Sequence, residues 1–196
     1  LIFETLFEFD PDWNPTPLLV ESVEVSEDGL THTWKLREGI KFHDGSDFNA
    51  EVVKWNIDRK IEQDTPLAQS IPWADNPVKV LSEYMVEVTL AEPSFVMYNY
   101  LSSSSWMMYS KEFVESVTAD DLKNRGVGTG PFVIKEYLPN DYLILERNPD
   151  YWQEGLPFFD EVNIKIIPEA NTRLLMLEAG EVDFVKDLSI QDLNRL

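Results

Sequence analysis

Residues 31–45 read THTWKLREGIKFHDG, and this stretch decides the first part of the fold. His32, Trp34 and Leu36 alternate with polar residues, which is the period-two pattern of a strand with one buried face. Glycines at positions 39 and 45 bracket a second apolar run, Ile40–Phe42. The stretch therefore predicts a hairpin-like pair of strands.

A helix is expected to follow, from Asn49 to about Glu62. Asn49 is a suitable N-cap, because its side-chain oxygen can accept a hydrogen bond from an amide of the first turn. Val53, Ile57 and Ile61 recur at a spacing of four residues and share one face. The sequence therefore predicts an amphipathic helix with one buried side.

The remaining apolar patterns predict strands and helices on both sides of a glycine cluster at 126–130. The expected strands are Val78–Leu81, Tyr84–Leu90, Phe132–Tyr137, Tyr142–Arg147, Val162–Ile167 and Glu181–Val185, and the expected helices are 94–101, 110–124 and Asn171–Ala179. The order strand, helix, strand after residue 160 is typical of a βαβ unit, so some parallel pairing is expected. The predicted fold class is α/β, or mixed α+β, with a subdomain boundary near residue 127.

Composition argues against several classes of function. The chain has 196 residues and a net charge of −20, from 16 basic and 36 acidic side chains, and this charge repels nucleic-acid phosphates. Cysteine is absent and histidine occurs twice, which argues against disulfides, a thiol nucleophile and a His-rich metal site. No unbroken apolar run exceeds four residues, so the sequence predicts no membrane-spanning segment.

The two ends suggest a piece of a longer protein. Leu1 begins inside an apolar pattern with no lead-in, and Ser189–Leu196 resembles the start of an element that then stops. On this expectation a targeting segment would lie outside the sequence, so its absence says nothing about location.

Three sequence patterns suggest a phosphate-binding, a calcium-binding or a catalytic site, but each lacks a residue or element that such a site requires. The glycine cluster lacks the following helix that a phosphate loop needs, so we interpret it as a backbone crossover that requires positive φ. Asp10, Asp12 and Asn14 are spaced as in a calcium loop, but the prolines at 11, 15 and 17 prevent the required wrapping. His43 and Asp44 have no G-x-S-x-G serine to accompany them, and a satisfied, partly buried histidine is the simpler interpretation. We therefore predict no catalytic residue, no metal ligand and no cofactor, and no enzyme activity.

The stretch from Tyr98 to Tyr109, YNYLSSSSWMMY, is the one candidate binding surface. Aromatic side chains supply contact area, small hydroxyls supply adaptable hydrogen bonds and Met supplies a soft fit. We name Tyr98, Ser104, Ser105 and Trp106 as candidate ligand-binding residues. The alternative is a packed helix followed by solvated serines, in which case Trp106 lies in the core.

Several phrases together resemble one family. LREGIKFHDG at 36–45, followed by NAEVV at 49–53, is similar to the signature LR-x-G-x-KFHDG…A-x-DV of the family 5 extracellular solute-binding proteins, the receptors of oligopeptide, dipeptide and nickel ABC importers. GTGPF at 128–132 and LERNPDYW at 145–152 resemble a second block of that family, and EAGEVD at 178–183 resembles its helix–strand segment. The departure at Glu51, where the family has an Asp-like position, leaves the subfamily open.

The resemblance implies a two-lobed receptor of periplasmic-binding-protein type II that closes on a solute by hinge motion. Residues 1–127 would form an accessory α+β subdomain of the first lobe. Residues 128–196 would form part of its central-sheet subdomain, a mixed sheet with flanking helices, and the second lobe would be absent. Arg147, Tyr151 and Trp152 would brace the fold, and the segment 98–106 would lie near the mouth of the cleft.

The implied function is an extracytoplasmic receptor, periplasmic or a cell-surface lipoprotein, that delivers a small-molecule or peptide ligand to the membrane permease of an ABC importer. We expect a peptide-type ligand, a monomer, and no nucleic-acid partner. On charge alone, the acidic surface favours cationic solutes. Two alternatives stay open: the solute-sensing domain of a transcription regulator, and a folded interaction scaffold without a small-molecule ligand.

Overall fold

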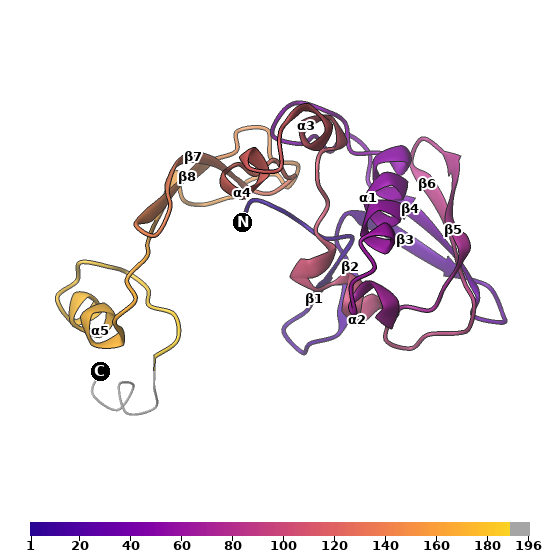
Figure 1. Cartoon of the computed structure of the whole chain (residues 1–196), viewed down its shortest axis with the longest axis horizontal. Helices are drawn as coiled ribbons and strands as arrows, with labels where there is room; N and C mark the ends of the chain where they lie inside the picture. The colour runs from indigo at the N-terminus through magenta and orange to yellow at the C-terminus, as the bar shows by residue number, and fades with distance from the viewer. Residues whose placement is uncertain (189–196) are drawn as a thin grey trace.

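The first part of the fold is built on a four-stranded antiparallel sheet with the strand order β3-β4-β6-β5 (Figure 1). The computed structural model describes residues 1–188, apart from the side chain at position 123. The strands of this sheet are β3 (Val20–Val25), β4 (Thr31–Leu36), β5 (Trp73–Ser82) and β6 (Met85–Leu90). Strand β3 was not predicted from the sequence, because it is an edge strand with a bulge after Val20 and most of its side chains are exposed.

The helix α1 (Ala50–Glu62) begins and ends where the sequence predicts. The side-chain oxygen of Asn49 accepts a hydrogen bond from the amide of Val52 at 3.1 Å, which caps the first turn. Val53 and Ile57 are fully buried and belong to the same hydrophobic core as Trp34 of β4. Packing of this apolar face against the sheet stabilises the helix.

Residues 37–48 form a loop that buries its apolar side chains, so the predicted second strand of the hairpin is wrong. Ile40 and Phe42 are buried, which explains their alternation with polar residues. Only an isolated bridge, between Lys41 and Asp47, forms within the loop, and β4 pairs with β3 and β6. Alternation records which side chains are buried, and a loop packed into the core produces the same pattern as a strand.

Short elements connect this sheet to the rest of the chain. They are β1 (Phe7–Phe9), β2 (Pro15–Pro17), η1 (Ala68–Ser70), α2 (Met97–Leu101), η2 (Ser104–Trp106), α3 (Lys111–Ser116) and α4 (Asp121–Asn124). The single helix predicted at 110–124 is thus two helices. Ser110 caps α3 by accepting from the amide of Phe113 at 3.0 Å, and extended backbone at Val117 ends it.

The C-terminal part contains a three-stranded antiparallel sheet that reaches away from the first part, with α5 at its far end (Figure 1). Its elements are β7 (Phe132–Leu138), β8 (Tyr142–Arg147), β9 (Glu161–Lys165) and α5 (Ala170–Glu178). All pairings among the described strands are antiparallel, so the expected parallel pairing is wrong there. Residues 181–185 pair with no strand of the described chain, so the strand expected there does not form, and Ser189–Leu196 lies outside the described residues.

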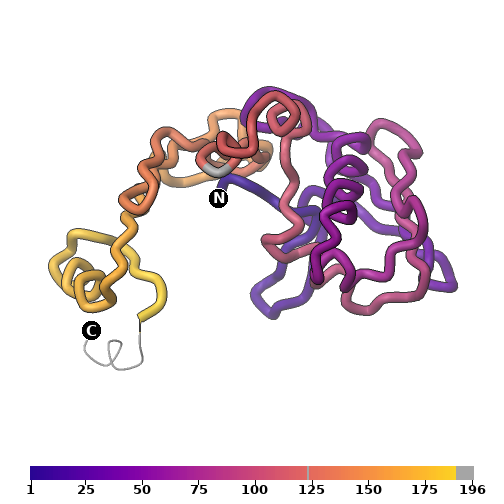
Figure 2. The backbone as a smooth tube through the Cα atoms, viewed as in Figure 1, coloured from indigo at the N-terminus to yellow at the C-terminus, as the bar shows by residue number. Residues whose placement is uncertain are grey.

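The two parts meet where the first residues of the chain run beside the glycine cluster (Figure 2). The amide of Gly130 donates to the carbonyl of Ile2 at 2.9 Å. A Cβ atom added at Gly128 would lie 2.2 Å from that same carbonyl oxygen, so only glycine permits the close approach. Neither glycine has positive φ, so the predicted reason for the cluster is wrong, and backbone contact is the actual one.

His43 links the glycine cluster to the loop at residues 37–48. Its Nε2–H donates to the carbonyl of Gly130 at 2.8 Å, and its Nδ1 accepts from the amide of Gly128 at 3.4 Å. Burial lowers the pKa of His43, although the Gly130 carbonyl and the charge of Asp44 act in the opposite direction. A neutral imidazole satisfies both contacts, which confirms the interpretation of His43 as a satisfied, partly buried histidine.

Candidate functional site

Tyr98 of α2 is already engaged by other side chains of the first part. Its hydroxyl donates to Nδ1 of His32 at 2.7 Å, and Nε2–H of His32 donates to the carbonyl of Gly29 at 3.2 Å. Its ring centroid lies 4.7 Å from that of Phe7. Burial raises the pKa of Tyr98 and lowers the pKa of His32, so the pair is neutral at pH 7. Tyr98 lines neither of the two cavities described below.

The four serines after α2 divide into two pairs. Ser102 and Ser103 donate to carbonyls of α2 at 2.8 and 2.7 Å and so close the end of the helix. Ser104 and Ser105 are exposed, and their hydroxyls have no hydrogen-bond partner within residues 1–188. Of the candidate residues, these two have hydroxyls available to a solute.

Trp106 lies in the hydrophobic core and is 2% exposed. Its ring centroid is 5.6 Å from that of Trp73. This burial is what the alternative interpretation, a core tryptophan, expects. The indole also lines a cavity, and its Nε1–H is buried without a partner among the described residues. Contact between Trp106 and a ligand therefore stays a proposal.

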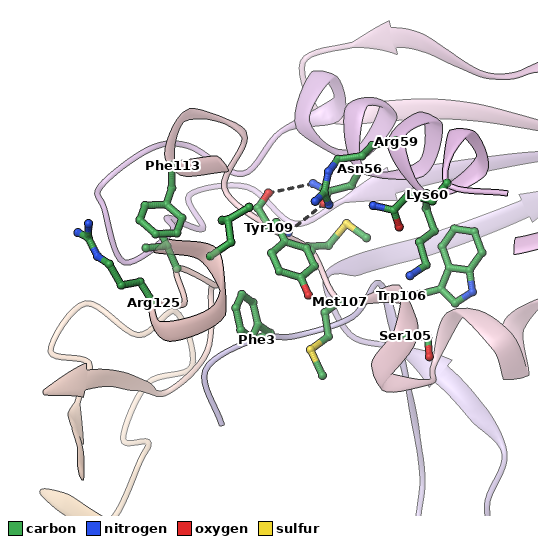
Figure 3. Close-up of a pocket in the computed structure, with 14 residues that line it drawn as sticks. Phe3, Asn56, Arg59, Lys60, Ser105, Trp106, Met107, Tyr109, Phe113 and Arg125 are labelled. Carbon is green, nitrogen blue, oxygen red and sulfur yellow. Dashed lines mark hydrogen bonds between the residues drawn. The ribbon is translucent and has the colours of Figure 1, made fainter. Parts of the chain in front are cut away.

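A cavity of about 200 Å³ is lined by residues of α1, of α4 and of the segment that follows η2 (Figure 3). Its lining includes three cationic side chains, Arg59, Lys60 and Arg125, and no Asp or Glu. Trp106 and Tyr109 supply aromatic surface, and Ser105 adds a hydroxyl. We term it the basic cavity. Its volume is below the roughly 300–1,000 Å³ of complete ligand pockets, so it can hold one group of a larger solute.

Asn56 of α1 fixes the wall of the basic cavity. Its amide nitrogen donates to the carbonyl of Tyr109 at 2.9 Å, and its amide oxygen accepts from the Tyr109 N–H at 3.0 Å (Figure 3). The guanidinium of Arg59 lies 5.6 Å from the ring centroid of Tyr109 and 5.5 Å from that of Trp55. These cation–π contacts position Arg59 without neutralising its charge.

A second, more open cavity of about 440 Å³ is lined by Ser104 together with Glu4, Glu8 and Tyr151. We term it the N-terminal cavity. The backbone carbonyl of Glu4 accepts from the amide of Met108 at 2.9 Å, so the N-terminal segment and the segment after η2 lie side by side. The candidate serines Ser104 and Ser105 therefore line two different cavities.

Glu4 links the N-terminal segment to the C-terminal part of the chain. Its carboxylate accepts hydrogen bonds from the hydroxyls of Tyr151 and Thr129, each at 2.7 Å, and from Nε1 of Trp152 at 3.0 Å. Burial raises the pKa of Glu4, although the three donors act to lower it. Tyr151 and Trp152 thus brace the fold as expected, and Arg147 does so too through the carbonyl of Phe158 at 3.0 Å.

The basic cavity was only partly visible in the sequence. The structure places Ser105 and Trp106 in it, but not Tyr98 or Ser104. The cationic residues were missed, because only the apolar face of this helix was considered in the sequence. Asn56, Lys60 and Gln63 recur at helical spacing and also line the cavity, so a second, polar face of the helix was the available signal.

Within residues 1–188, no group of three His, Cys, Asp or Glu side chains is arranged to hold a metal ion. None of the helices in this range has the length and apolar character needed to cross a bilayer.

Comparisons with known proteins give one family. The family model described as bacterial extracellular solute-binding proteins, family 5 Middle, matches residues 14–196. The chain is 34% identical over 183 residues to the glutathione-binding protein GsiB of Salmonella typhi, a match that covers 93% of this chain and 36% of that protein.

Solved structures give the same likeness. NikA from Brucella suis in complex with Fe(III)-EDTA is 32% identical with a TM-score of 0.80, over 94% of this chain and 37% of that one. DppA from Helicobacter pylori in complex with the peptide STSA is 25% identical with a TM-score of 0.86, over 100% of this chain and 42% of that one. The chain spans less than half the length of each of these relatives. The likeness confirms the predicted fold class, a mixed α/β part of a type II periplasmic-binding-protein lobe.

Proposed function

The chain belongs to the family 5 bacterial extracellular solute-binding proteins, and from this membership we propose that it is part of the first lobe of a peptide-type receptor for an ABC importer. In this proposal residues 1–127 form an accessory subdomain, residues 128–196 contribute to the central-sheet subdomain, and a second lobe completes the cleft. The receptor is extracytoplasmic, in the periplasm or as a cell-surface lipoprotein. It acts as a monomer without a cofactor, delivers its ligand to the permease, and catalyses no reaction.

The observation that carries the binding role is the basic cavity. It combines aromatic surface, cationic side chains and an unused hydroxyl, which are the features of a specific solute site. Its small volume agrees with a cleft whose other wall comes from a second lobe. Ser104 and Ser105 would contact the solute from the segment around η2, Trp106 would contribute its indole, and Tyr98 would support α2 behind them.

The relatives supply the first solutes to test. GsiB is named for glutathione, and DppA was solved with a peptide. Peptides are therefore the first class to examine for this chain, followed by metal chelates of the kind held by NikA.

Thermal unfolding of the complete receptor in the presence of peptides, glutathione and metal chelates tests the proposal. A solute that binds only the folded state raises the midpoint, and the rise grows with solute concentration. If no solute changes the midpoint, the receptor proposal is wrong, and hydrolysis of any of the solutes would then indicate an enzyme.

One observation favours a second candidate, an interaction scaffold without a small-molecule ligand, and it is the burial of Trp106. A scaffold would leave the midpoint unchanged with every solute and would hydrolyse none of them. GsiB and DppA are named as binding proteins, and none of the three relatives is named as a transcription regulator, so the comparisons do not favour the regulator.

A further inference from the structure

The charge of the basic cavity is opposite to that of the chain. Acidic side chains outnumber basic ones by 36 to 16 over the whole sequence. The 14 residues that line the cavity nevertheless include three cations and no carboxylate. A local positive site within a strongly negative molecule needs an explanation beyond general surface charge.

Two of the three cations at the cavity, Arg59 and Lys60, lack the ion pairs that other cations of this chain make. Lys35, Lys41 and Lys135 each lie 2.6–2.7 Å from a carboxylate oxygen. Within residues 1–188, neither Arg59 nor Lys60 has a carboxylate within 4.0 Å. Arg59 is held by aromatic rings alone, so its N–H donors remain available.

Among the other polar groups of the cavity, the hydroxyl of Ser105 can donate a hydrogen bond to a solute. Nε1–H of Trp106 has no partner among the described residues, but it is fully buried and so closed to a solute in the cavity. The Ser105 hydroxyl is unused, whereas both polar atoms of the Asn56 amide are occupied by Tyr109. A cavity that offers cationic and neutral donors suits a group with several acceptor oxygens and a negative charge.

We propose that the basic cavity receives a carboxylate of the transported solute, so that the solutes of this receptor are acidic peptides. This inference rests on the proposed receptor function and specifies its ligand. Arg59 and Lys60 bind the carboxylate, and Trp106 and Tyr109 cover the apolar atoms next to it. The volume of about 200 Å³ suits one acidic side chain. The proposal opposes the expectation from overall charge, which favours cationic solutes.

Three dipeptides that differ in one side chain test the proposal on the complete receptor by calorimetry. They are Phe-Glu, Phe-Gln and Phe-Lys, measured at about 0.15 M salt so that the field of distant charges is screened beyond about 8 Å. Phe-Glu should bind most tightly and Phe-Lys most weakly. Arg59→Gln and Lys60→Gln should each weaken Phe-Glu by about tenfold or more, as expected for loss of a hydrogen bond between charged groups. The same substitutions should change the affinity for Phe-Gln by less than about threefold.

Lys54→Gln is the matched control. It removes the same charge from the same helix, but Lys54 is paired with Asp58 at 2.6 Å and does not line the cavity. This variant should bind all three peptides as the unmodified receptor does. Unchanged melting without peptide shows that each variant is folded.

The possible results separate the two proposals. Equal losses for Phe-Glu and Phe-Gln, or a preference for Phe-Lys, overturn the carboxylate assignment and leave the receptor function standing. Binding of another solute but of none of the three peptides also overturns it. If no solute of the wider panel binds, the receptor function itself is wrong.

Discussion

Replacement of the buried carboxylate of Glu4 should separate the N-terminal segment from the C-terminal part. Glu4→Ala leaves three donors without their acceptor, the hydroxyls of Tyr151 and Thr129 and the indole N–H of Trp152. Hydrogen bonds to a charged group contribute about 1.5–3 kcal/mol each, but removal of the buried charge also relieves its desolvation cost. We expect a net loss of about 3 kcal/mol in the free energy of unfolding, measured in urea at pH 7.

Glu4→Gln separates the hydrogen bonds from the charge. The amide oxygen can accept from Thr129 and Trp152 while the amide nitrogen donates to the Tyr151 oxygen, so all three contacts can remain. Burial in the folded state raises the pKa of Glu4 above its usual value. Folded Glu4 therefore keeps its proton at pH values where Glu4 of the unfolded chain has already lost it. Stability from this group is therefore lost as pH rises from about 4.5 through the folded pKa. Glu4→Gln should equal or exceed the unmodified chain in stability at pH 7.

Glu8→Ala is the control for these two variants. Glu8 is also acidic and lines the N-terminal cavity, but it is exposed, so its removal should change stability by less than about 0.5 kcal/mol. A loss below about 1 kcal/mol for Glu4→Ala, or equal losses for the alanine and glutamine variants, would refute the reasoning.

Two further substitutions, Gly128→Ala and Trp106→Ala, test the junction and the core, and each has a control. Gly128→Ala places a Cβ 2.2 Å from a backbone oxygen and should prevent the native junction. Gly126→Ala meets only side-chain atoms, the ring edge of Phe3 at 3.0 Å and Cδ1 of Ile134 at 3.5 Å, so it should lose less stability. Urea unfolding compares the two variants, and equal stability would contradict the close-approach argument. Trp106→Ala should lower the free energy of unfolding by about 3–5 kcal/mol, because the side chain is buried. Trp13→Ala is the control: its site is 76% exposed, so it should lose little stability in the same unfolding experiment. A small loss of stability for Trp106→Ala would show that this side chain is not part of the core.

Local chemistry determined those elements that depend on neighbouring residues. The N-cap at Asn49 and the apolar spacing that follows it specify α1 within the sequence itself, because capping and amphipathicity act over a few residues. The strands β6, β7 and β8 also lie close to where alternation predicts them. The family motifs and their order could also be recognised in the sequence, and they were enough to identify the fold class.

Tertiary structure alone decided which elements meet. Ile40 and Phe42 alternate with polar residues as in a strand, yet they are the buried side chains of a loop, because burial leaves the same pattern whether or not the backbone pairs. Arg59 lines the cavity because the segment after η2 packs across α1, which the sequence of the helix does not indicate. Glu4 reads as an ordinary acidic residue, and its partner Tyr151 lies 147 positions away. Periodicity records whether a side chain is buried, but what it is buried against depends on contacts between segments far apart in the chain.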